Sequence, residues 1–385
     1  MTATLLPSRQ PPRRRAREAA GAGRLDSLTG LRFLAAFAVF THHFTGASPS
    51  GGVAHAPALF PYSTMGVNGV GFFFVLSGFL LAWGHRSGTG AKEFYRRRAG
   101  RVLPLHLAAT VPCVWVFHVW GGVPWDLPSF LASLALVQTW FPGVVPMFPG
   151  NGVSWTLSVE AFFYLLFPFV VRGAYRLRTR TLLALAASGL LAMWAVNWWA
   201  AAHLSPFHRE WLMRLPPVRL PEFVLGLTLA LAVGRGLRVP LRPVVLTAAF
   251  AAYTVVYVHR DAWCSDAVAA QLGYSVRPLV AVFSALLIVA YVRRERAGRR
   301  GWLCTPVMVR LGAWSYAFYL LHQTVNRLIL DHWGRQEPTN LSVFTLLGVA
   351  SVVVALSWAA YTYVEEPARR WWSGRRSARS DYTLT

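Results

Sequence analysis

Apolar residues fall in long blocks separated by short polar segments, and this pattern predicts an all-α protein that crosses a membrane many times. Ten blocks are long enough, or nearly so, to span about 30 Å of hydrocarbon as helices rising about 1.5 Å per residue. We place them at residues 31–49, 66–84, 102–121, 153–171, 182–200, 218–234, 243–258, 276–292, 306–328 and 342–363. An eleventh apolar piece, 128–141, is short and flanked by prolines, so we expect a re-entrant or interfacial segment.

The composition and the placement of charge support this interpretation. Apolar residues make up 55% of the 385 residues and charged residues 14%, against about 25% charged in a typical soluble domain. A net charge of +23 can indicate nucleic-acid binding. Here, with ten crossings and both termini cytoplasmic, 31 of the 38 Lys and Arg residues lie in cytoplasmic segments, as the positive-inside rule predicts. We therefore expect a multi-pass protein of the inner (cytoplasmic) membrane, with the lipid bilayer and not nucleic acid as its partner.

The segments outside the apolar blocks predict no further domain. We interpret residues 1–30 as a disordered basic cytoplasmic arm, 31–367 as the membrane domain and 368–385 as a basic cytoplasmic tail. The chain has three cysteines, Cys113, Cys264 and Cys304. They show neither a CxxC pair nor a metal-ligand spacing, so we expect no metal site and no disulfide. The sequence does not indicate an oligomeric state.

The first span carries ionisable side chains, which are costly in lipid and therefore mark candidates for function. Arg32 and His43 are 11 residues apart, which corresponds to three helical turns plus about 20° and a rise of about 16 Å. The two share one helix face, with Arg32 at the cytoplasmic mouth and His43 near the middle of the bilayer. His42 points about 100° away. The structural alternative is a buried histidine bonded to a neighbouring helix and an arginine that anchors the inner end.

Glu160 lies in the fourth span, within Ser154-Trp-Thr-Leu-Ser-Val-Glu160. This span enters from the outer side, which places Glu160 about 10 Å deep, against about 14 Å for His43. A carboxylate can orient an imidazole and stabilise its protonated form, so a His43–Glu160 pair would suit acyl transfer. The sequence leaves open whether the two touch. The alternative is a glutamate that pairs with an arginine for packing alone.

A basic stretch leads into the third span and contains Arg97, Arg98 and Arg101. Arg98 and Arg101 are neighbours at i,i+3 near the cytoplasmic start of a helix. Guanidinium groups suit bidentate contacts with phosphate, so we take these arginines as candidates for binding an anionic cofactor. The alternative is anchoring by the positive-inside rule alone.

Three further features lie inside or beside the spans. Ser77 and Gly78 form a small step in an aromatic helix, which favours close helix packing over a nucleophile. Arg219 and Glu222 begin the sixth span and either pair with each other or line the outer vestibule. His322 is a second histidine at mid-membrane depth, structural or functional. We take Glu222, Arg219 and His322 as candidate substrate-binding residues.

Seven motifs follow one another along the chain in an order typical of a known family. They are Arg-x10-His, Phe-Phe-Val-Leu-Ser-Gly-Phe, Arg-x-x-Arg, Ser-Trp-Thr-Leu-Ser-Val-Glu-x-x-Phe-Tyr, Arg-x-x-Glu-Phe-x-x-Gly, Ser-Tyr-x-x-Tyr-Leu-x-His and the closing Tyr363-Val-Glu-Glu-Pro367. The chain resembles the acyltransferase 3 family of integral-membrane O-acyltransferases from about Arg24 to Arg370, without the extracytoplasmic SGNH-type domain that many members carry. The start Ser27-Leu-Thr-Gly-Leu-Arg32 is similar, more weakly, to actinobacterial members that acylate macrolide sugars.

The resemblance implies ten helices around a pore, with an acyl-CoA donor entering from the cytoplasm. It implies a catalytic His43, assisted by Arg32 and Glu160, and donor binding by Arg98 and Arg101, to which we add Arg97. We expect transfer of an acyl group to a hydroxyl of a sugar-containing acceptor such as a macrolide, either directly or through a covalent enzyme intermediate.

Three alternatives stay open from the sequence. In the first, the protein is an acyltransferase whose acceptor is a cell-envelope polysaccharide or a lipid-linked sugar. In the second, it is a proton-coupled transporter that catalyses no reaction. In the third, it is a structural membrane subunit. Against a transporter stand the absence of inverted repeats and the arginine cluster at one mouth. A structural subunit would not need intramembrane Arg, His and Glu side chains at matching depths.

Overall fold

The structure, a computed structural model, describes residues 25–46, 52–85, 88, 90–124, 126–143 and 150–373. In these residues the chain is helical, and its one extended pairing is an isolated parallel bridge between Ala54 and Gln336. The helical class predicted from the sequence is confirmed. Most of the predicted N-terminal arm, part of the C-terminal tail and two of the prolines after the 128–141 segment, Pro146 and Pro149, lie outside the described residues.

Each of the ten predicted apolar blocks overlaps a helix, although several helices begin before their block. These helices are α2 (Asp26–Phe44), α4 (Gly69–Trp83), α5 (Ala91–Val114), α7 (Trp155–Arg176), α8 (Thr179–His203), α10 (Pro216–Gly234), α11 (Pro243–Val258), α13 (Asp266–Arg296), α14 (Pro306–Trp333) and α15 (Ser342–Ala360). Shorter helical segments connect or extend them. They are α3 (Phe60–Ser63), η1 (Thr64–Asn68), η2 (Trp115–Trp120), α6 (Leu127–Leu134), η3 (Gln138–Trp140), η4 (Gly152–Ser154), α9 (Pro206–Leu212), α12 (Arg260–Trp263), η5 (Trp302–Cys304), η6 (Tyr361–Glu365) and α16 (Glu366–Ser373).

Seven helical stretches of the described chain are both long and apolar enough to cross a membrane. They are Phe60–Trp83, Ala91–Trp120, Gly152–Arg176, Thr179–His203, Pro216–Gly234, Asp266–Arg296 and Ser342–Trp372. Helices α2 and α14 have sufficient length but carry more polar side chains, and α11 has 16 residues. The count of ten crossings and the cytoplasmic position of both termini therefore stay predictions. The 128–141 segment contains only α6 and η3, both too short to cross.

Helix α2 begins at Asp26, inside the range that the sequence assigned to the arm. Its start is capped by Glu295 at the end of α13, whose carboxylate accepts the backbone N–H of Asp26 at 2.8 Å and that of Ser27 at 3.0 Å. The Ser27 hydroxyl donates to the same carboxylate. A carboxylate at a helix start satisfies free N–H groups and complements the helix dipole. At the other end of the chain, α16 extends the helical structure into the predicted tail.

Close glycine contacts hold the central helices together. A Cβ on Gly78 of α4 would lie 2.0 Å from the Phe223 carbonyl oxygen of α10, and a Cβ on Gly226 would lie 1.9 Å from that of Val75. The two backbones are therefore in direct contact, as small residues permit, and the predicted packing role of the Ser77-Gly78 step is supported. Gly312 makes the same kind of contact between α14 and α2.

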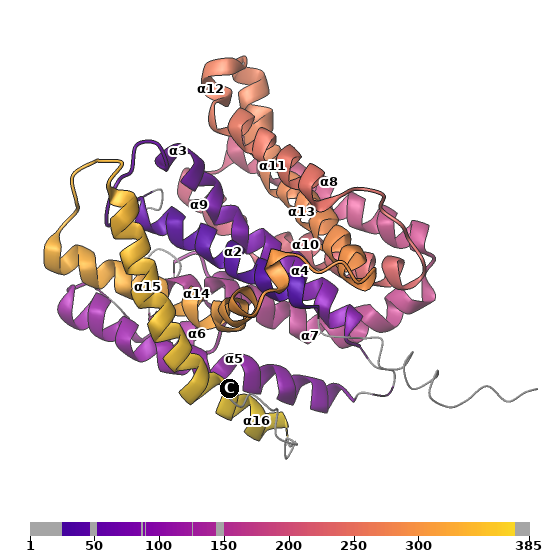
Figure 1. Cartoon of the computed structure of the whole chain (residues 1–385), viewed down its shortest axis with the longest axis horizontal. Coiled ribbons are helices and arrows are strands. Elements are labelled where there is room, and N and C mark those ends of the chain that lie inside the picture. Colours follow the sequence, from indigo (N-terminus) through magenta and orange to yellow (C-terminus); the bar gives the residue numbers. More distant parts are fainter. Residues whose placement is uncertain are drawn as a thin grey trace, which may run out of the picture.

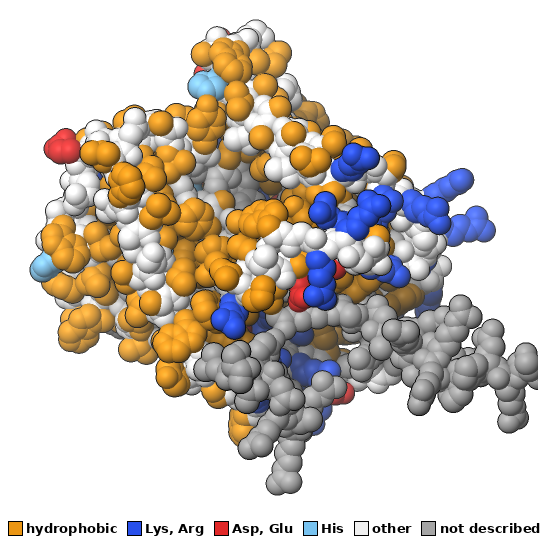
Figure 2. All heavy atoms as spheres, in the orientation of Figure 1, with side chains coloured by type: hydrophobic (Ala, Val, Ile, Leu, Met, Phe, Trp, Pro, Cys, Tyr) orange, Lys and Arg blue, Asp and Glu red, His pale blue; other side chains and the backbone are white. Residues whose placement is uncertain are grey.

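The helices are grouped around this centre (Figure 1). In that view α2 and α4 run through the middle, α8, α10, α11 and α13 lie toward the upper right, and α5 and α16 lie below. Figure 2 shows hydrophobic side chains over most of the visible surface, whereas Lys and Arg gather toward one side. Large apolar side chains such as Val111, Leu191 and Phe344 are more than half exposed. Such a surface suits a lipid environment with the charge at one end of the bundle.

Candidate active site

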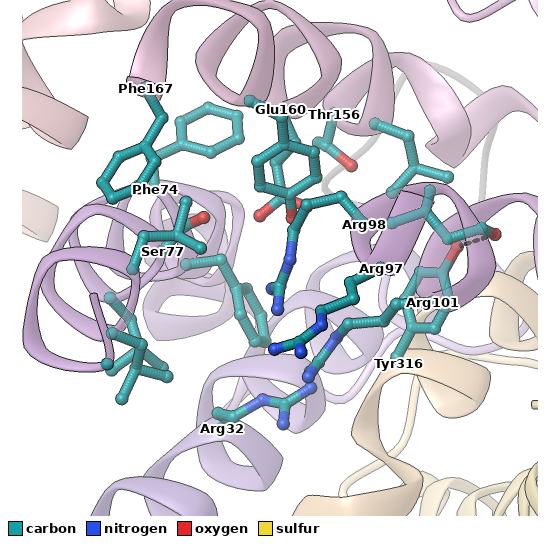
Figure 3. A pocket seen from close by; sticks show the side chains of 18 of the residues that line it. Arg32, Phe74, Ser77, Arg97, Arg98, Arg101, Thr156, Glu160, Phe167 and Tyr316 are labelled. Atoms are coloured by element: carbon teal, nitrogen blue, oxygen red, sulfur yellow. Dashed lines mark hydrogen bonds between the residues drawn. The ribbon is translucent and has the colours of Figure 1, made fainter. Parts of the chain in front are cut away.

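A cavity of about 620 Å³ opens between α2, α4, α5, α7 and α14, at the end of the bundle where α2 and α5 begin. We call it the donor cavity. Its walls gather five of the site residues predicted from the sequence, which are Arg32, Arg97, Arg98, Arg101 and Glu160. Figure 3 shows the arginine side chains converging from α2 and α5, with Glu160 on the opposite wall. The fold therefore brings together residues that are up to 128 positions apart in the sequence.

Three of these arginines have no carboxylate in contact. Among the ion pairs of the described residues none includes Arg32, Arg98 or Arg101, which we call the arginine cluster. Arg98 Nε is buried without a hydrogen-bond partner. Arg97 differs, because it pairs with Glu93 and its side chain is 41% exposed. Guanidinium groups that line one cavity without an ion pair are suited to contact an anion with several oxygens, such as phosphate.

Glu160 faces this cluster and not His43. Its Oε2 accepts a hydrogen bond from the Tyr164 hydroxyl at 2.8 Å, one turn along α7. The charges that act on it most strongly are those of Arg101, Arg32 and Arg98. No hydrogen bond joins Glu160 to His43 in the described structure, so the contact that the sequence left open is not made here.

His43 is instead paired with His322. His43 Nδ1 lies 2.9 Å from His322 Nε2, and His322 Nδ1 lies 2.7 Å from the carbonyl oxygen of Tyr319. A carbonyl can only accept, so the hydrogen of neutral His322 is on Nδ1 and its Nε2 is an acceptor. His43 must then donate from Nδ1, which leaves its Nε2 unprotonated. The hydrogen-bond network thus assigns the tautomer in which His43 Nε2 can act as a base.

The neighbouring histidine has a structural position. His42 is buried, its Nδ1 lies 3.2 Å from the Ser63 carbonyl oxygen, and it does not line the donor cavity. His43 does not line the donor cavity either, so the prediction that His42 points away from the face shared by Arg32 and His43 stays a prediction.

Arg219 and Glu222 pair with each other, which was one of the two possibilities left open. Arg219 Nε lies 2.9 Å from Glu222 Oε2, and both side chains are almost fully buried. A Cβ on Gly71 would lie 2.7 Å from Glu222 Oε1, so the glycine makes room for the carboxylate. The Arg219 guanidinium also lies over the Phe74 ring at 5.2 Å. Loss of either charge would leave the other buried and unpaired. The substrate-binding role given to the two residues stays a prediction.

Two residues near the site received no role from the sequence. Glu365 is buried at the end of the π-helical turn η6 and acts electrostatically on Arg101 and Arg32. Such turns are frequent at functional sites, and the closing Tyr-Val-Glu-Glu-Pro motif was the available signal. Arg214 lies over the Trp155 ring at 5.3 Å and is close enough to His43 and Tyr319 to interact with both electrostatically. The sequence held one indication of Arg214: it is one of the few arginines on the side of the membrane where the predicted topology places little positive charge.

The chain is similar to known acyltransferases over nearly its whole length. Residues 25–362 match the family described as an acyltransferase domain. The chain is 34% identical over 378 residues to acyltransferase MdmB of Streptomyces mycarofaciens, covering 92% of this chain and 94% of that protein.

Two other relatives match over shorter regions. The putative peptidoglycan O-acetyltransferase YrhL of Bacillus subtilis is 29% identical over 196 residues, which cover 45% of this chain and 28% of that protein. The exopolysaccharide production protein ExoZ of Rhizobium meliloti is 33% identical over 108 residues, which cover 27% and 34%. No solved structure matches the chain. On the strength of the match over residues 25–362 and of the motifs gathered at the donor cavity, the chain belongs to the acyltransferase 3 family.

Proposed function

We propose that the protein is an acyl-CoA-dependent O-acyltransferase of the inner membrane that acylates a hydroxyl of a sugar-containing acceptor. The observation that carries this proposal is the arginine cluster without carboxylate partners, on a cavity whose first helix, α2, also holds the base-competent His43. An anion site and a base at opposite ends of one helix suit a long donor with a charged nucleotide and a distant reactive thioester.

In this proposal the arginine cluster binds the phosphates of CoA. Arg98 and Arg101 hold the nucleotide, and Arg32 extends the positive surface along α2. The pantetheine arm then runs along the cavity toward His43. The rise from Arg32 to His43 on a helix is about 16 Å, and an extended arm of about 15–20 Å matches it. Glu160 and Glu365 oppose the cluster without contacting it, so they limit the binding of the CoA product.

His43 Nε2 acts as the general base. It takes the proton of the acceptor hydroxyl while the hydroxyl oxygen attacks the thioester carbonyl of the donor. As the C–S bond breaks, the imidazolium returns the proton to the leaving CoA thiolate, which balances the transfer. His322 takes the part that the sequence had suggested for Glu160, because it fixes the His43 tautomer. General-base catalysis of this kind contributes about 10²–10⁴-fold to the rate.

We propose a glycosylated natural product such as a macrolide as the acceptor. The relative aligned over 94% of its length is named an acyltransferase without reference to an envelope polymer, whereas the relatives named for peptidoglycan and exopolysaccharide align over only 28% and 34% of theirs. The names of those two relatives favour the second candidate, O-acetylation of a cell-envelope polysaccharide or lipid-linked sugar. Both candidates present a sugar hydroxyl to the same base.

Release of free CoA by the purified protein tests the proposal. The detergent-solubilised wild type and His43→Ala receive acetyl-CoA and longer acyl-CoAs with a panel of glycosylated acceptors. We expect acceptor-dependent release that His43→Ala reduces by at least about 100-fold, while acyl-CoA binding by the variant stays intact. Transport of a substrate into proteoliposomes without CoA release would overturn the proposal, as would full turnover by a folded His43→Ala variant.

A further inference from the structure

A second cavity, of about 570 Å³, lies at the end of the bundle opposite the arginine cluster. We call it the distal cavity. Its walls come from α3 and η1, which follow the end of α2, and from the end of α8, α9, the end of α11, α12 and the first turns of α13. Because α2 begins at the donor cavity and ends beside α3, the two cavities lie toward opposite ends of α2, and His43 lines neither of them. In Figure 1 the segments α3, α9 and α12 lie in the upper part of the molecule, away from α5 and α16.

Two of the three arginines that line the distal cavity have a carboxylate partner, unlike those of the arginine cluster. Arg277 lies 3.5 Å from Glu210, and Arg260 lies 3.4 Å from Asp261. Arg209 donates from Nε and Nη2 to the side-chain oxygen of Asn197, at 3.1 and 2.9 Å. A polyphosphate would have to compete with these partners. A neutral ligand that both donates and accepts hydrogen bonds would not, because guanidinium edges and carboxylate lone pairs remain free to meet hydroxyl groups.

Glu210 is the central acceptor of this cavity. Its side chain is 50% exposed, and its Oε1 lies 3.0 Å from Arg214 Nη2. Burial opposes ionisation of this carboxyl, but the charges of Arg277 and Arg214 outweigh burial and hold its pKa below the ordinary value. Glu210 is therefore an ionised carboxylate near neutral pH and accepts hydrogen bonds from hydroxyl groups.

The same residue connects the cavity to the base. Arg214, the partner of Glu210, is the arginine that acts electrostatically on His43 and lies over Trp155. A ligand hydrogen-bonded to Glu210 is thus one side chain away from the surroundings of His43.

The remaining walls supply flat apolar surface beside the polar groups. Phe60 and Tyr257 line the cavity, and the guanidinium of Arg260 stacks over the Tyr257 ring at 4.4 Å. A pyranose ring presents just this combination, with C–H faces that pack on aromatic rings and hydroxyl edges that meet planar polar groups. The cavity volume lies within the range of about 300–1,000 Å³ that is usual for small-molecule sites.

We propose that the distal cavity binds the glycosyl group of the acceptor and delivers its hydroxyl to His43 from the end opposite to acyl-CoA. This inference rests on the proposed function. It assigns Glu210 and Arg209 to sugar recognition and separates the path of the acceptor from that of the donor. Saturating acyl-CoA therefore does not compete with the acceptor.

Binding of a glycoside without any acyl donor tests this inference apart from catalysis. The probes are a macrolide glycoside with free sugar hydroxyl groups, its aglycone and a short oligosaccharide, titrated into the His43→Ala protein and followed by tryptophan fluorescence. We expect the glycoside or the oligosaccharide to bind, and Glu210→Gln and Arg209→Gln in the same background to weaken that binding by about 10–100-fold, as for hydrogen bonds to charged groups. The aglycone should bind at least about 10-fold more weakly, and the stronger of the two sugar probes identifies the acceptor class.

The matched control is Asp266→Asn, an exposed carboxylate at the start of α13 that does not line the cavity. In turnover, Glu210→Gln should raise the KM for the acceptor and leave that for acyl-CoA unchanged. Acyl-CoA binding by each variant shows that it is folded. The inference is overturned if neither sugar probe binds at millimolar concentration, or if both distal variants bind as the parent does. Acyl transfer with unchanged acceptor KM in these variants would refute the distal site while the proposed function stands.

Discussion

Replacement of His322 by alanine tests whether this residue sets the protonation pattern of His43. In the structure the His322 ring accepts from His43 Nδ1 at 2.9 Å and donates to the Tyr319 carbonyl oxygen at 2.7 Å. Alanine removes the acceptor, so the proton of neutral His43 can occupy either ring nitrogen. Only the tautomer with the proton on Nδ1 keeps Nε2 free to act as the base.

The expected loss follows from these two contacts. A neutral hydrogen bond contributes about 1 kcal/mol net, which corresponds to about a 5-fold preference for one tautomer. Loss of ring alignment adds to this, and the upper limit is the loss of about 10⁴-fold seen when a catalytic histidine is held in the wrong tautomer. We expect kcat to fall about 10–100-fold. The KM for acyl-CoA should change less than about 3-fold, because the arginine cluster sets donor binding.

A second substitution separates hydrogen-bond polarity from shape. In His322→Gln the side-chain oxygen can accept from His43 and the amide N–H can donate to Tyr319, so we expect this variant to recover most of the activity lost in the alanine variant. His118→Ala is the matched control, since His118 is also buried but its ring contacts Val123 and Gly150 instead of the site. CoA release gives kcat, and thermal unfolding in detergent reports folding.

Wild-type kcat in a folded His322→Ala protein would refute the tautomer argument. Equal losses of kcat in the alanine and glutamine variants would show that His322 acts through packing, and not by accepting a hydrogen bond from His43 while donating one to Tyr319.

Three further substitutions give separate outcomes. Arg98→Gln should raise the KM for acyl-CoA about 10–100-fold. Arg97→Gln should raise it less than about 5-fold, because Arg97 is partly exposed and already paired with Glu93. Titrations with acyl-CoA compare the two variants, and equal effects would contradict the assignment. Glu365→Gln removes a negative charge near the arginine cluster and should strengthen inhibition by free CoA about 3–10-fold. Product-inhibition kinetics measure this effect, and weaker inhibition would argue against binding of CoA at the arginine cluster. Gly226→Leu would place a Cβ 1.9 Å from a backbone oxygen and should lower the melting temperature in detergent sharply, while Gly348→Ala, with open space around it, should be neutral or slightly stabilising.

Much of the architecture could be predicted because it depends on local pattern. The apolar blocks identified a helix at each of ten places, and Arg32 and His43 lie on one helix, α2. The closeness of Arg98 to Arg101 is likewise a property of one helix, and so is the ion pair between Arg219 and Glu222. In each case the relevant partners are separated by few residues or by whole turns, so the sequence carries their geometry.

The rest depends on contacts between distant helices. The partner of His43 lies on α14, 279 residues away, and depth alone could not separate His322 from Glu160. Two side chains at matching depth meet only if their helices turn the right faces toward each other, and crossing angles are set by glycine contacts such as Gly78 on Phe223. The start of α2 was misplaced for the same reason, because its cap is supplied by another helix.

That cap on α2 has a consequence for biosynthesis. Helix α2 leaves the ribosome early, yet the carboxylate of Glu295 that completes its start is made 269 residues later. His322, which accepts the hydrogen bond from His43 Nδ1, is made later still. Helix α2 must therefore persist through most of translation with its N-terminal end uncapped. A nascent chain released before α14 would contain His43 and the arginine cluster but not the hydrogen bond between His43 and His322, so the proposed active centre is complete only late in synthesis.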